Sequence, residues 1–175
     1  MNEFKFSLEP GIKRYENRDY MDQNPIISVV VPFYNSGKYI EQTINSVLNQ
    51  TFPYYEILIV DDGSKDEESL KKLEEVGKLD NRIKVFHKDN EGLAATRDFG
   101  ASKSADTCKY LMFLDDDDLI EPTFLECAYW TLETNSEAAW AYSDSIGFGT
   151  REYTWNKYFN SEKLKEENEL ISEAL

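Results

Sequence analysis

The chain is poor in the residues that mark several large classes of protein. Its 175 residues include two cysteines, Cys108 and Cys127, which have neither metal-site spacing nor a disulfide framework pattern. A reduced, intracellular protein is therefore expected. No stretch approaches 18 consecutive apolar residues and no signal-peptide pattern is present, so we expect neither a spanning helix nor a secretory signal. The single histidine, His87, has no neighbouring ligands in the sequence and is interpreted as structural.

Positive charge is also scarce. The chain has 19 Lys and Arg against 34 Asp and Glu, a formal net charge of −15. Nucleic acid and anionic membrane surfaces repel such a chain, so neither is expected as a partner. A small anionic ligand remains compatible with this charge if a metal ion or a positioned Arg compensates it locally. The content of 41% hydrophobic and 14% aromatic residues indicates a folded domain.

What the chain does have is an alternation of apolar runs and amphipathic segments. Apolar runs rich in β-branched residues predict buried strands over 26–31, 55–60, 83–86, 109–114 and 140–143. Helical spacing predicts helices between them: one capped by Ser36, one carrying Leu70, Leu73 and Val76, one carrying Ala94, Ala95 and Ala101, and one over 123–134. The alternation predicts an α/β fold, a doubly wound, mainly parallel sheet with helices on both faces.

The ends of the chain differ from its middle. Residues 1–25 are polar and irregular, and we expect an N-terminal extension there, followed by a domain over 26–147. After 147 the pattern weakens, although Tyr153 and Trp155 alternate with polar residues as in a half-exposed strand. Residues 161–175 are charged and helical in propensity, and they stop without a polar closing segment, so we expect a separate region over 148–175 that ends in an interrupted element.

The most informative stretch is the acidic run Asp115–Asp118, which follows a predicted buried strand. Carboxylates at such a strand end point into the crevice where open α/β sheets bind ligands. Two unit charges about 4 Å apart repel by roughly 4 kcal/mol at an effective dielectric near 20. A hard cation such as Mg²⁺ or Mn²⁺ would relieve that repulsion. A solvated loop that caps the helix near Pro122 explains this segment equally well.

Other polar segments follow the same edge of the predicted sheet. Pro32–Asn35 ends the first strand, Asp61–Ser64 ends the second, and Asn90–Gly100 precedes the fourth. All of these strand ends face one side of a parallel sheet and can share one pocket. From the residues alone, Asp61–Ser64 is equally a turn with a helix cap. On the same interpretation, which assigns these segments no ligand, Tyr34 is a packing residue and Arg97 is a surface cation.

The order of these motifs resembles the family 2 glycosyltransferases, inverting enzymes of the GT-A fold, over about residues 26–145. The motifs that carry the resemblance are Val30–Asn35, Ser46–Thr51, Glu56–Ser64, Asn90–Gly100 and Leu114–Pro122. Asp98 stands where the family usually has Asn. The resemblance implies transfer of a sugar from a nucleotide-diphosphate sugar, UDP-linked, to a saccharide or lipid-linked acceptor with inversion. It also implies a cytoplasmic enzyme, including the inner face of the membrane, in cell-surface polysaccharide biosynthesis.

The resemblance implies a nucleobase site made by the first two strand ends. Pro32 and Tyr34 would line the base, with the Tyr34 ring packed beside it. Asp62 would accept a hydrogen bond from the edge of a uracil-type base, and Asp61 would support Asp62.

The resemblance also implies a diphosphate and metal site. Asp115 and Asp117 match the two acids of the DxD motif, with Asp117 as the direct ligand of Mn²⁺ or Mg²⁺ and Asp115 contacting the ribose or the metal and its waters. Asp116 is an extra acid of the donor site. Arg97 would contact the diphosphate, which suits an anionic ligand in an acidic protein.

The general base is the part that the resemblance does not supply within the chain. In the family it lies downstream, on the acceptor-binding half, whose truncated start we expect over 148–175. We therefore expect the base beyond Leu175, with Asp144 as the candidate inside the chain. Truncation would leave an apolar surface that favours self-association, made by Tyr153, Trp155, Tyr158, Phe159 and Leu170.

Two other functions are open on the sequence. One is a donor-binding fragment or scaffold module without turnover. The other is a nucleotidyltransferase, for which the loop Tyr34–Lys38 has only one Gly and one Lys to hold phosphate. A dinucleotide-dependent dehydrogenase is disfavoured because no G-x-G-x-x-G follows the first strand.

Overall fold

A computed structural model describes residues 24–143, 145–147 and 153–155. The boundary between two compact units falls between Trp130 and Thr131. The elements up to this boundary are β1 (Ile27–Phe33), α1 (Ile40–Leu48), β2 (Tyr55–Asp61), α2 (Glu67–Val76), β3 (Ile83–His87), α3 (Leu93–Ala101), β4 (Tyr110–Phe113) and α4 (Phe124–Thr134), which crosses it. Beyond it, β5 (Ser145–Gly147) and β6 (Tyr153–Trp155) pair antiparallel.

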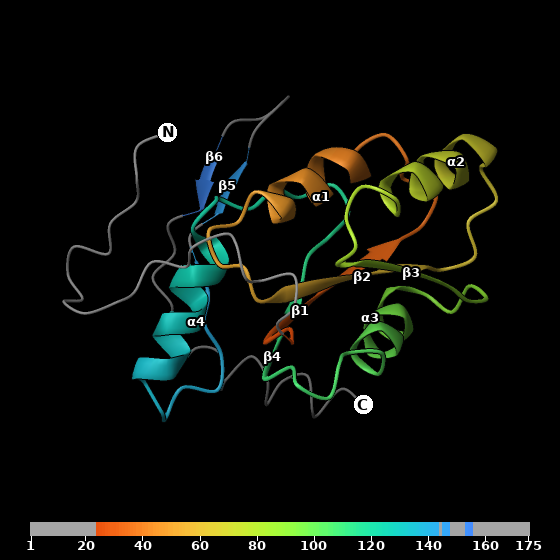
Figure 1. Cartoon of the computed structure of the whole chain (residues 1–175). Coiled ribbons are helices and arrows are strands. Elements are labelled where there is room, and N and C mark those ends of the chain that lie inside the picture. Colours follow the sequence, from red (N-terminus) through yellow and green to blue (C-terminus); the bar gives the residue numbers. More distant parts are fainter. Residues whose placement is uncertain (1–23, 144, 148–152, 156–175) are drawn as a thin grey trace, which may run out of the picture. The chain divides into compact units, whose positions relative to one another are not determined.

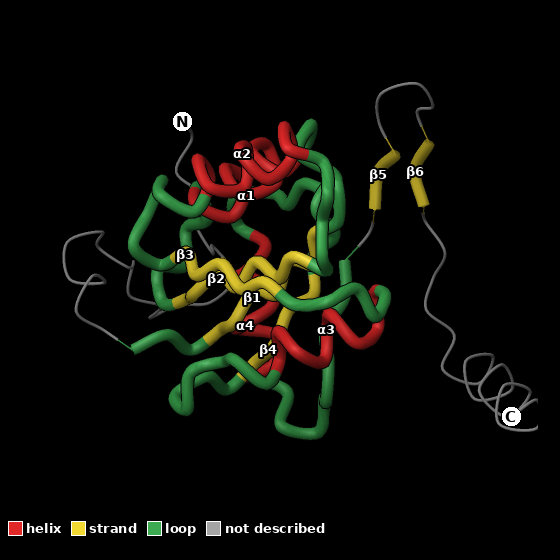
Figure 2. Tube along the Cα trace, turned by 90° about the vertical axis from the view of Figure 1, so that its right-hand side faces the viewer, coloured by secondary structure: helices red, strands yellow, loops and turns green. Residues whose placement is uncertain are grey.

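The first unit contains a parallel sheet with the strand order β3-β2-β1-β4. The chain runs outward from β1 to β3 and then returns to the other side of β1, so its direction of winding reverses between β1 and β4. Helices α1 and α2 cover one face of the sheet and α3 covers the other (Figures 1 and 2). The predicted doubly wound sheet with helices on both faces is confirmed.

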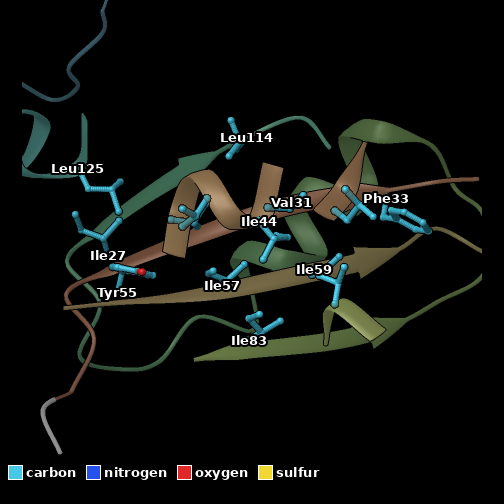
Figure 3. Close-up of a cluster of buried hydrophobic side chains, with 14 of the residues drawn as sticks. Ile27, Val31, Phe33, Ile44, Tyr55, Ile57, Ile59, Ile83, Leu114 and Leu125 are labelled. Carbon is cyan, nitrogen blue, oxygen red and sulfur yellow. The ribbon is translucent and has the colours of Figure 1, made fainter. Parts of the chain in front are cut away.

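The two central strands, β1 and β2, are buried over their whole length. Alternate residues of β1 face opposite layers: Val31 packs with Ile44 of α1 and Ile57 of β2 (Figure 3), whereas Val30 meets α3. Each such side chain contributes about 1.5–3 kcal/mol when it is fully buried. Burial on both faces explains why these strands read as continuous apolar runs.

Helix α3 packs closely on the sheet at Gly100. A Cβ atom added at Gly100 would lie 2.3 Å from Cγ1 of Val30 and 3.2 Å from Cγ2 of Val60. The absence of a side chain at this position lets α3 lie against β1 and β2. This matters for function because the N-terminal end of α3 reaches the strand ends that carry the polar motifs.

Two predictions about the segment that joins β1 to α1 were wrong. Pro32 was expected to end the first strand, but β1 continues to Phe33 and Pro32 pairs with Val60. Ser36 was expected to cap the first helix, but α1 begins at Ile40 after Tyr39, which makes no side-chain capping bond. The Ser36 hydroxyl instead donates a hydrogen bond to the carboxylate of Asp116.

The predicted fifth strand was also wrong, since residues 140–143 are irregular. Trp140 and Tyr142 are more than half exposed, and their rings lie 5.5 Å apart, packed on each other. A strand needs a partner edge, which a local run of aromatic residues does not supply. The predicted strand at Tyr153 and Trp155 is confirmed as β6.

Several expectations concern residues outside those that the structure describes. They include nearly all of the N-terminal extension and the segment from 156 to 175, so the domain bounds stay predictions. Within the described ranges, no helix combines the length and apolar character needed to cross a membrane.

Candidate functional site

A cleft of about 390 Å³ opens at the carboxyl ends of β1, β2 and β4. Six residues expected from the sequence line it: Pro32, Tyr34, Asp62, Asp115, Asp116 and Asp117. Six further lining residues were not among the expected site residues: Phe33, Ser36, Asn90, Gly92, Leu93 and Thr96. Asp61 and Arg97, also expected at the site, lie next to lining residues without lining the cleft themselves.

Asp62 is a buried carboxylate whose oxygens are almost fully engaged. Oδ1 accepts hydrogen bonds from Nζ of Lys88 at 2.7 Å and from the backbone N–H of Glu91 at 3.0 Å. Oδ2 accepts one from the backbone N–H of Gly92 at 2.8 Å. Burial alone would raise the pKa of Asp62, but these bonds and the nearby Thr96 lower it to about 2. The single hydroxyl proton of Thr96 is donated to the carbonyl oxygen of Gly92 at 2.9 Å, so Thr96 does not occupy an acceptor position of Asp62. Because a carboxylate has about four acceptor positions, Oδ2 retains one for a ligand.

Asp61, the neighbour of Asp62, is buried and is not among the residues that line the cleft. Its Oδ1 accepts from the backbone N–H of Ser64 at 2.9 Å, and its Oδ2 lies 2.9 Å from Nδ1 of His87. Asp61 is 3% exposed, so its carboxylate fixes the turn after β2 and does not face the cleft. His87, interpreted from the sequence as structural, contacts the Asp61 carboxylate.

The loop after β1 is joined to the turn after β2 through Asn35. Its backbone N–H donates to Oγ of Ser64 at 2.9 Å, and its Oδ1 accepts from the N–H groups of Lys65 and Asp66 at 2.9 and 3.0 Å. Asn35 has a φ of 52°, a left-handed conformation that Asn adopts more readily than most residues. These bonds hold the preceding residue, Tyr34, at the cleft with 51% of its surface exposed.

The acidic segment after β4 forms the opposite wall of the cleft. Nη2 of Arg97, on α3, donates to Oδ1 of Asp115 at 2.6 Å. Burial raises the pKa of Asp116, a hydrogen bond from Ser36 opposes this, and the charges of Asp117 and Asp115 raise it further. The segment therefore concentrates more negative charge than its protein partners compensate.

The donor set at this wall fits a divalent cation that also binds a ligand. Among the described residues, no group of three His, Cys, Asp or Glu side chains is arranged to hold a metal ion. Mg²⁺ and related ions are commonly held by one or two carboxylates together with substrate phosphates, so a complete protein cage is not required. Asp115 and Asp117 both line the cleft and meet that requirement.

The chain matches the family model described as Glycosyl transferase family 2 over residues 28–174. The chain belongs to this family. An uncharacterized glycosyltransferase of Rickettsia conorii is 44% identical over 110 residues, which are 63% of this chain and 18% of that protein. Putative glycosyltransferase EpsH of Bacillus subtilis is 41% identical over 104 residues, 59% of this chain and 29% of that one.

A solved structure is also similar to the chain. S. aureus TarS 1–349, crystallised in complex with UDP-GlcNAc, is 32% identical with a TM-score of 0.54, covering 62% of this chain and 31% of TarS 1–349. Each match spans less than a third of the relative's length. The family resemblance and its fold are thus confirmed. Asp144, the candidate base, lies outside the described residues, as does most of the apolar surface expected to self-associate.

Proposed function

We propose that this family 2 chain binds a nucleotide-diphosphate sugar, UDP-linked, as the donor part of an inverting glycosyltransferase. The observation that carries the proposal is one cleft that brings together Tyr34, Asp62 and the acidic segment Asp115–Asp117. It has an aromatic surface and a hydrogen-bond acceptor for a base at one wall. At the other wall it has carboxylates suited to a metal-bound diphosphate. The UDP-GlcNAc complex of TarS supports the choice of nucleotide.

The base end of the cleft suits a uracil ring. The remaining acceptor position on Oδ2 of Asp62 pairs with one ring N–H, which the imide of uracil provides. The low pKa of Asp62 keeps this carboxylate ionised at neutral pH, so it acts as an acceptor only. The exposed ring of Tyr34 offers a face against which a flat base packs.

The phosphate end pairs an anionic ligand with an acidic wall, so a cation is needed between them. Asp115 and Asp117 would hold Mn²⁺ or Mg²⁺, and Asp116 would add negative charge behind them. When bound, such an ion stabilises negative charge on the departing nucleoside diphosphate. Arg97 already contacts Asp115, and its guanidinium is placed to neutralise part of the same charge.

Transfer itself needs a group that takes the proton of the acceptor hydroxyl. No described residue that lines the cleft beyond those above is a carboxylate or histidine. The base therefore stays a prediction for residues outside the described ones, Asp144 included. The proposal includes a saccharide or lipid-linked acceptor at the inner face of the cytoplasmic membrane, as the resemblance implies. A scaffold module would bind the donor equally well and differ only by lacking turnover.

Calorimetry of the full chain with UDP, with and without Mn²⁺, tests the donor site. We expect binding in both conditions and tighter binding with the metal. Because a ligand that binds only the folded state stabilises it, UDP should also raise the melting temperature more with Mn²⁺ than without. A folded chain that binds neither UDP nor GDP under either condition overturns the proposal. Binding of GDP but not UDP would overturn the assignment of the base.

A further inference from the structure

Three polar side chains in or just after helix α1 face the acidic segment and the turn that follows it. Thr43 and Ser46 are three positions apart on one side of the helix, and Gln50 follows its end. All three contact backbone groups of the same stretch. Thr43 and Gln50 are buried, at 0% and 8% exposure. Polar side chains buried on a helix face need partners, and here their partners are backbone groups between Asp116 and Leu125.

The first two contacts fix the beginning of this stretch. Oγ1 of Thr43 donates to the carbonyl oxygen of Asp116 at 2.8 Å. Oγ of Ser46 accepts from the backbone N–H of Ile120 at 3.2 Å and donates to the carbonyl oxygen of Thr43 at 2.7 Å. The Ser46 hydroxyl is thus used in both directions, which fixes its rotamer as well as the loop.

Gln50 fixes the far end with both halves of its amide. Nε2 donates to the carbonyl oxygen of Glu121 at 2.7 Å and to that of Ser46 at 3.1 Å. Oε1 accepts from the backbone N–H of Leu125 at 2.9 Å. Beside it, the backbone N–H of Thr51 donates to the carbonyl oxygen of Pro122 at 2.8 Å.

These contacts help to decide where the carboxylates of the acidic segment lie, together with the hydrogen bonds that Asp115 accepts from Arg97 and Asp116 accepts from Ser36. The segment follows β4, which ends at Phe113, so the sheet does not hold it. Its carboxylates repel one another, and the loop would relax outward unless other bonds held it. The α1 contacts oppose that movement by satisfying backbone groups that would otherwise need water.

We propose that Thr43, Ser46 and Gln50 are positioning residues that hold Asp115–Asp117 in place to receive a metal-bound diphosphate. The inference rests on the proposed function and deepens it: the diphosphate end of the cleft is built by α1 through backbone contacts. The base end is built by Tyr34 and Asp62, and the hydrogen bonds that hold Asp62 come from Lys88, Glu91 and Gly92 rather than from these three residues. Substitution of the three residues should therefore separate the two ends of the cleft.

The test compares three variants of the full chain. Gln50→Met keeps the length of the side chain and removes both amide partners. Thr43→Val keeps the volume and removes one hydroxyl, and it serves if Gln50→Met does not fold. Gln42→Met makes the same chemical change as Gln50→Met on the exposed side of α1 and is the matched control. Calorimetry measures the affinity for uridine, for UDP with chelator, and for UDP with Mn²⁺.

We expect Gln50→Met to weaken UDP binding with Mn²⁺ by about tenfold, as losses of supporting contacts around metal ligands do. Its affinity for uridine should stay within about twofold of the wild type by the same reasoning, and Gln42→Met should match the wild type in every measurement. Hydrogen exchange should show faster exchange at the amides of Ile120 and Leu125 in Gln50→Met, independently of any ligand.

Two results overturn the inference while leaving the proposed function intact. One is that Mn²⁺ increases the UDP affinity of the wild type and increases that of Gln50→Met by the same factor. The other is an equal loss of uridine and metal-bound UDP affinity, which indicates a purely structural role. A wild type that binds uridine and UDP under no condition instead overturns the proposed function itself, and the positioning role with it.

Discussion

Nζ of Lys88 donates a hydrogen bond of 2.7 Å to Oδ1 of Asp62, and the two side chains are only 8% and 6% exposed. Nζ of Lys88 also lies 2.9 Å from a carboxylate oxygen of Glu91. The backbone N–H of Glu91 is the second donor to Oδ1 of Asp62. The ion pair therefore orients Asp62 and joins the end of β3 to the loop before α3. Oδ2 is left as the oxygen that a nucleobase can reach.

We expect Lys88→Met to weaken UDP binding by roughly tenfold, since a hydrogen bond to a charged group contributes about 1.5–3 kcal/mol. Asp62 would keep its two backbone N–H bonds, so the chain should still fold. Calorimetry with UDP measures the loss. Lys78→Met is the control, because Lys78 is 79% exposed and its contact with Glu74 is 4.0 Å long. Equal affinities of Lys88→Met and the wild type would show that Lys88 does not hold the base site.

The low pKa of Asp62 predicts that the free energy of unfolding falls at acid pH as this carboxylate is protonated. The folded pKa, about 2, lies below the ordinary value of 3.8. Such a carboxyl stabilises the fold above the unfolded pKa, and the contribution is lost as the pH falls through the folded value. It is therefore complete above about pH 5, falls most steeply between about pH 4 and pH 2, and is absent only below both pKa values. With about 1.4 kcal/mol per pKa unit and some screening at the cleft, its size is about 1–2 kcal/mol.

Chemical unfolding of the wild type and of Asp62→Asn between pH 7 and pH 2 measures this contribution. The difference in unfolding free energy between the two should be largest near neutral pH and shrink between pH 4 and pH 2. Other carboxylates titrate in both proteins and cancel in the difference. A difference that stays constant over this range would contradict the assignment of the shifted pKa to Asp62.

Much of the fold was predictable because its signals are local. Central parallel strands are buried on both faces, so β1 and β2 stand out as apolar runs and define the sheet. The strand predicted at 140–143 failed because pairing is not local: aromatic residues there have strand propensity, but Trp140 and Tyr142 pack on each other. Pro32 misled for a related reason, since its place inside β1 depends on its partner Val60.

The site was predictable where a residue belongs to a motif at a strand end, as with Tyr34 and Asp62. Lys88 was missed because one lysine in a charged chain carries no pattern, and its role appears only when the end of β3 lies beside Asp62. Ser36 and Thr96 were missed similarly, because each acts through a contact made by another segment. The signal that was available is the spacing of Thr43, Ser46 and Gln50, which places polar residues near the apolar positions of α1 such as Ile44 and Val47.

Asp117→Ala should remove most of the gain in UDP affinity that Mn²⁺ provides. The ligand-free chain should keep its stability, because Asp117 is exposed and its charge raises the pKa of Asp118 by repulsion, after the larger effect of burial. Calorimetry with and without Mn²⁺ and thermal unfolding measure the two effects.

Asp144→Ala should leave metal-dependent binding nearly unchanged. Asp106→Ala, which changes an exposed acid outside the cleft, should do the same. Equal losses in Asp117→Ala and Asp144→Ala would mean that the metal ligand is misassigned.

Gly100→Ala should destabilise the chain by about 1–3 kcal/mol, the usual cost of overpacking a core. Its new methyl group would lie 2.3 Å from Cγ1 of Val30, far inside the 3.5–4.0 Å at which carbon atoms attract. Helix α3 must then move away from β1, and with it Arg97, so UDP binding should weaken too. Asp98→Ala, an exposed change on the same helix, is the control for unfolding.

A second substitution decides the cause of the loss. Val30→Ala alone leaves a cavity, but combined with Gly100→Ala it makes room for the new methyl group. The double variant should therefore be more stable than the sum of the single losses predicts, with a coupling of about 0.5–3 kcal/mol. Strict additivity in chemical unfolding would show that the contact between α3 and Val30 does not limit the packing of this helix.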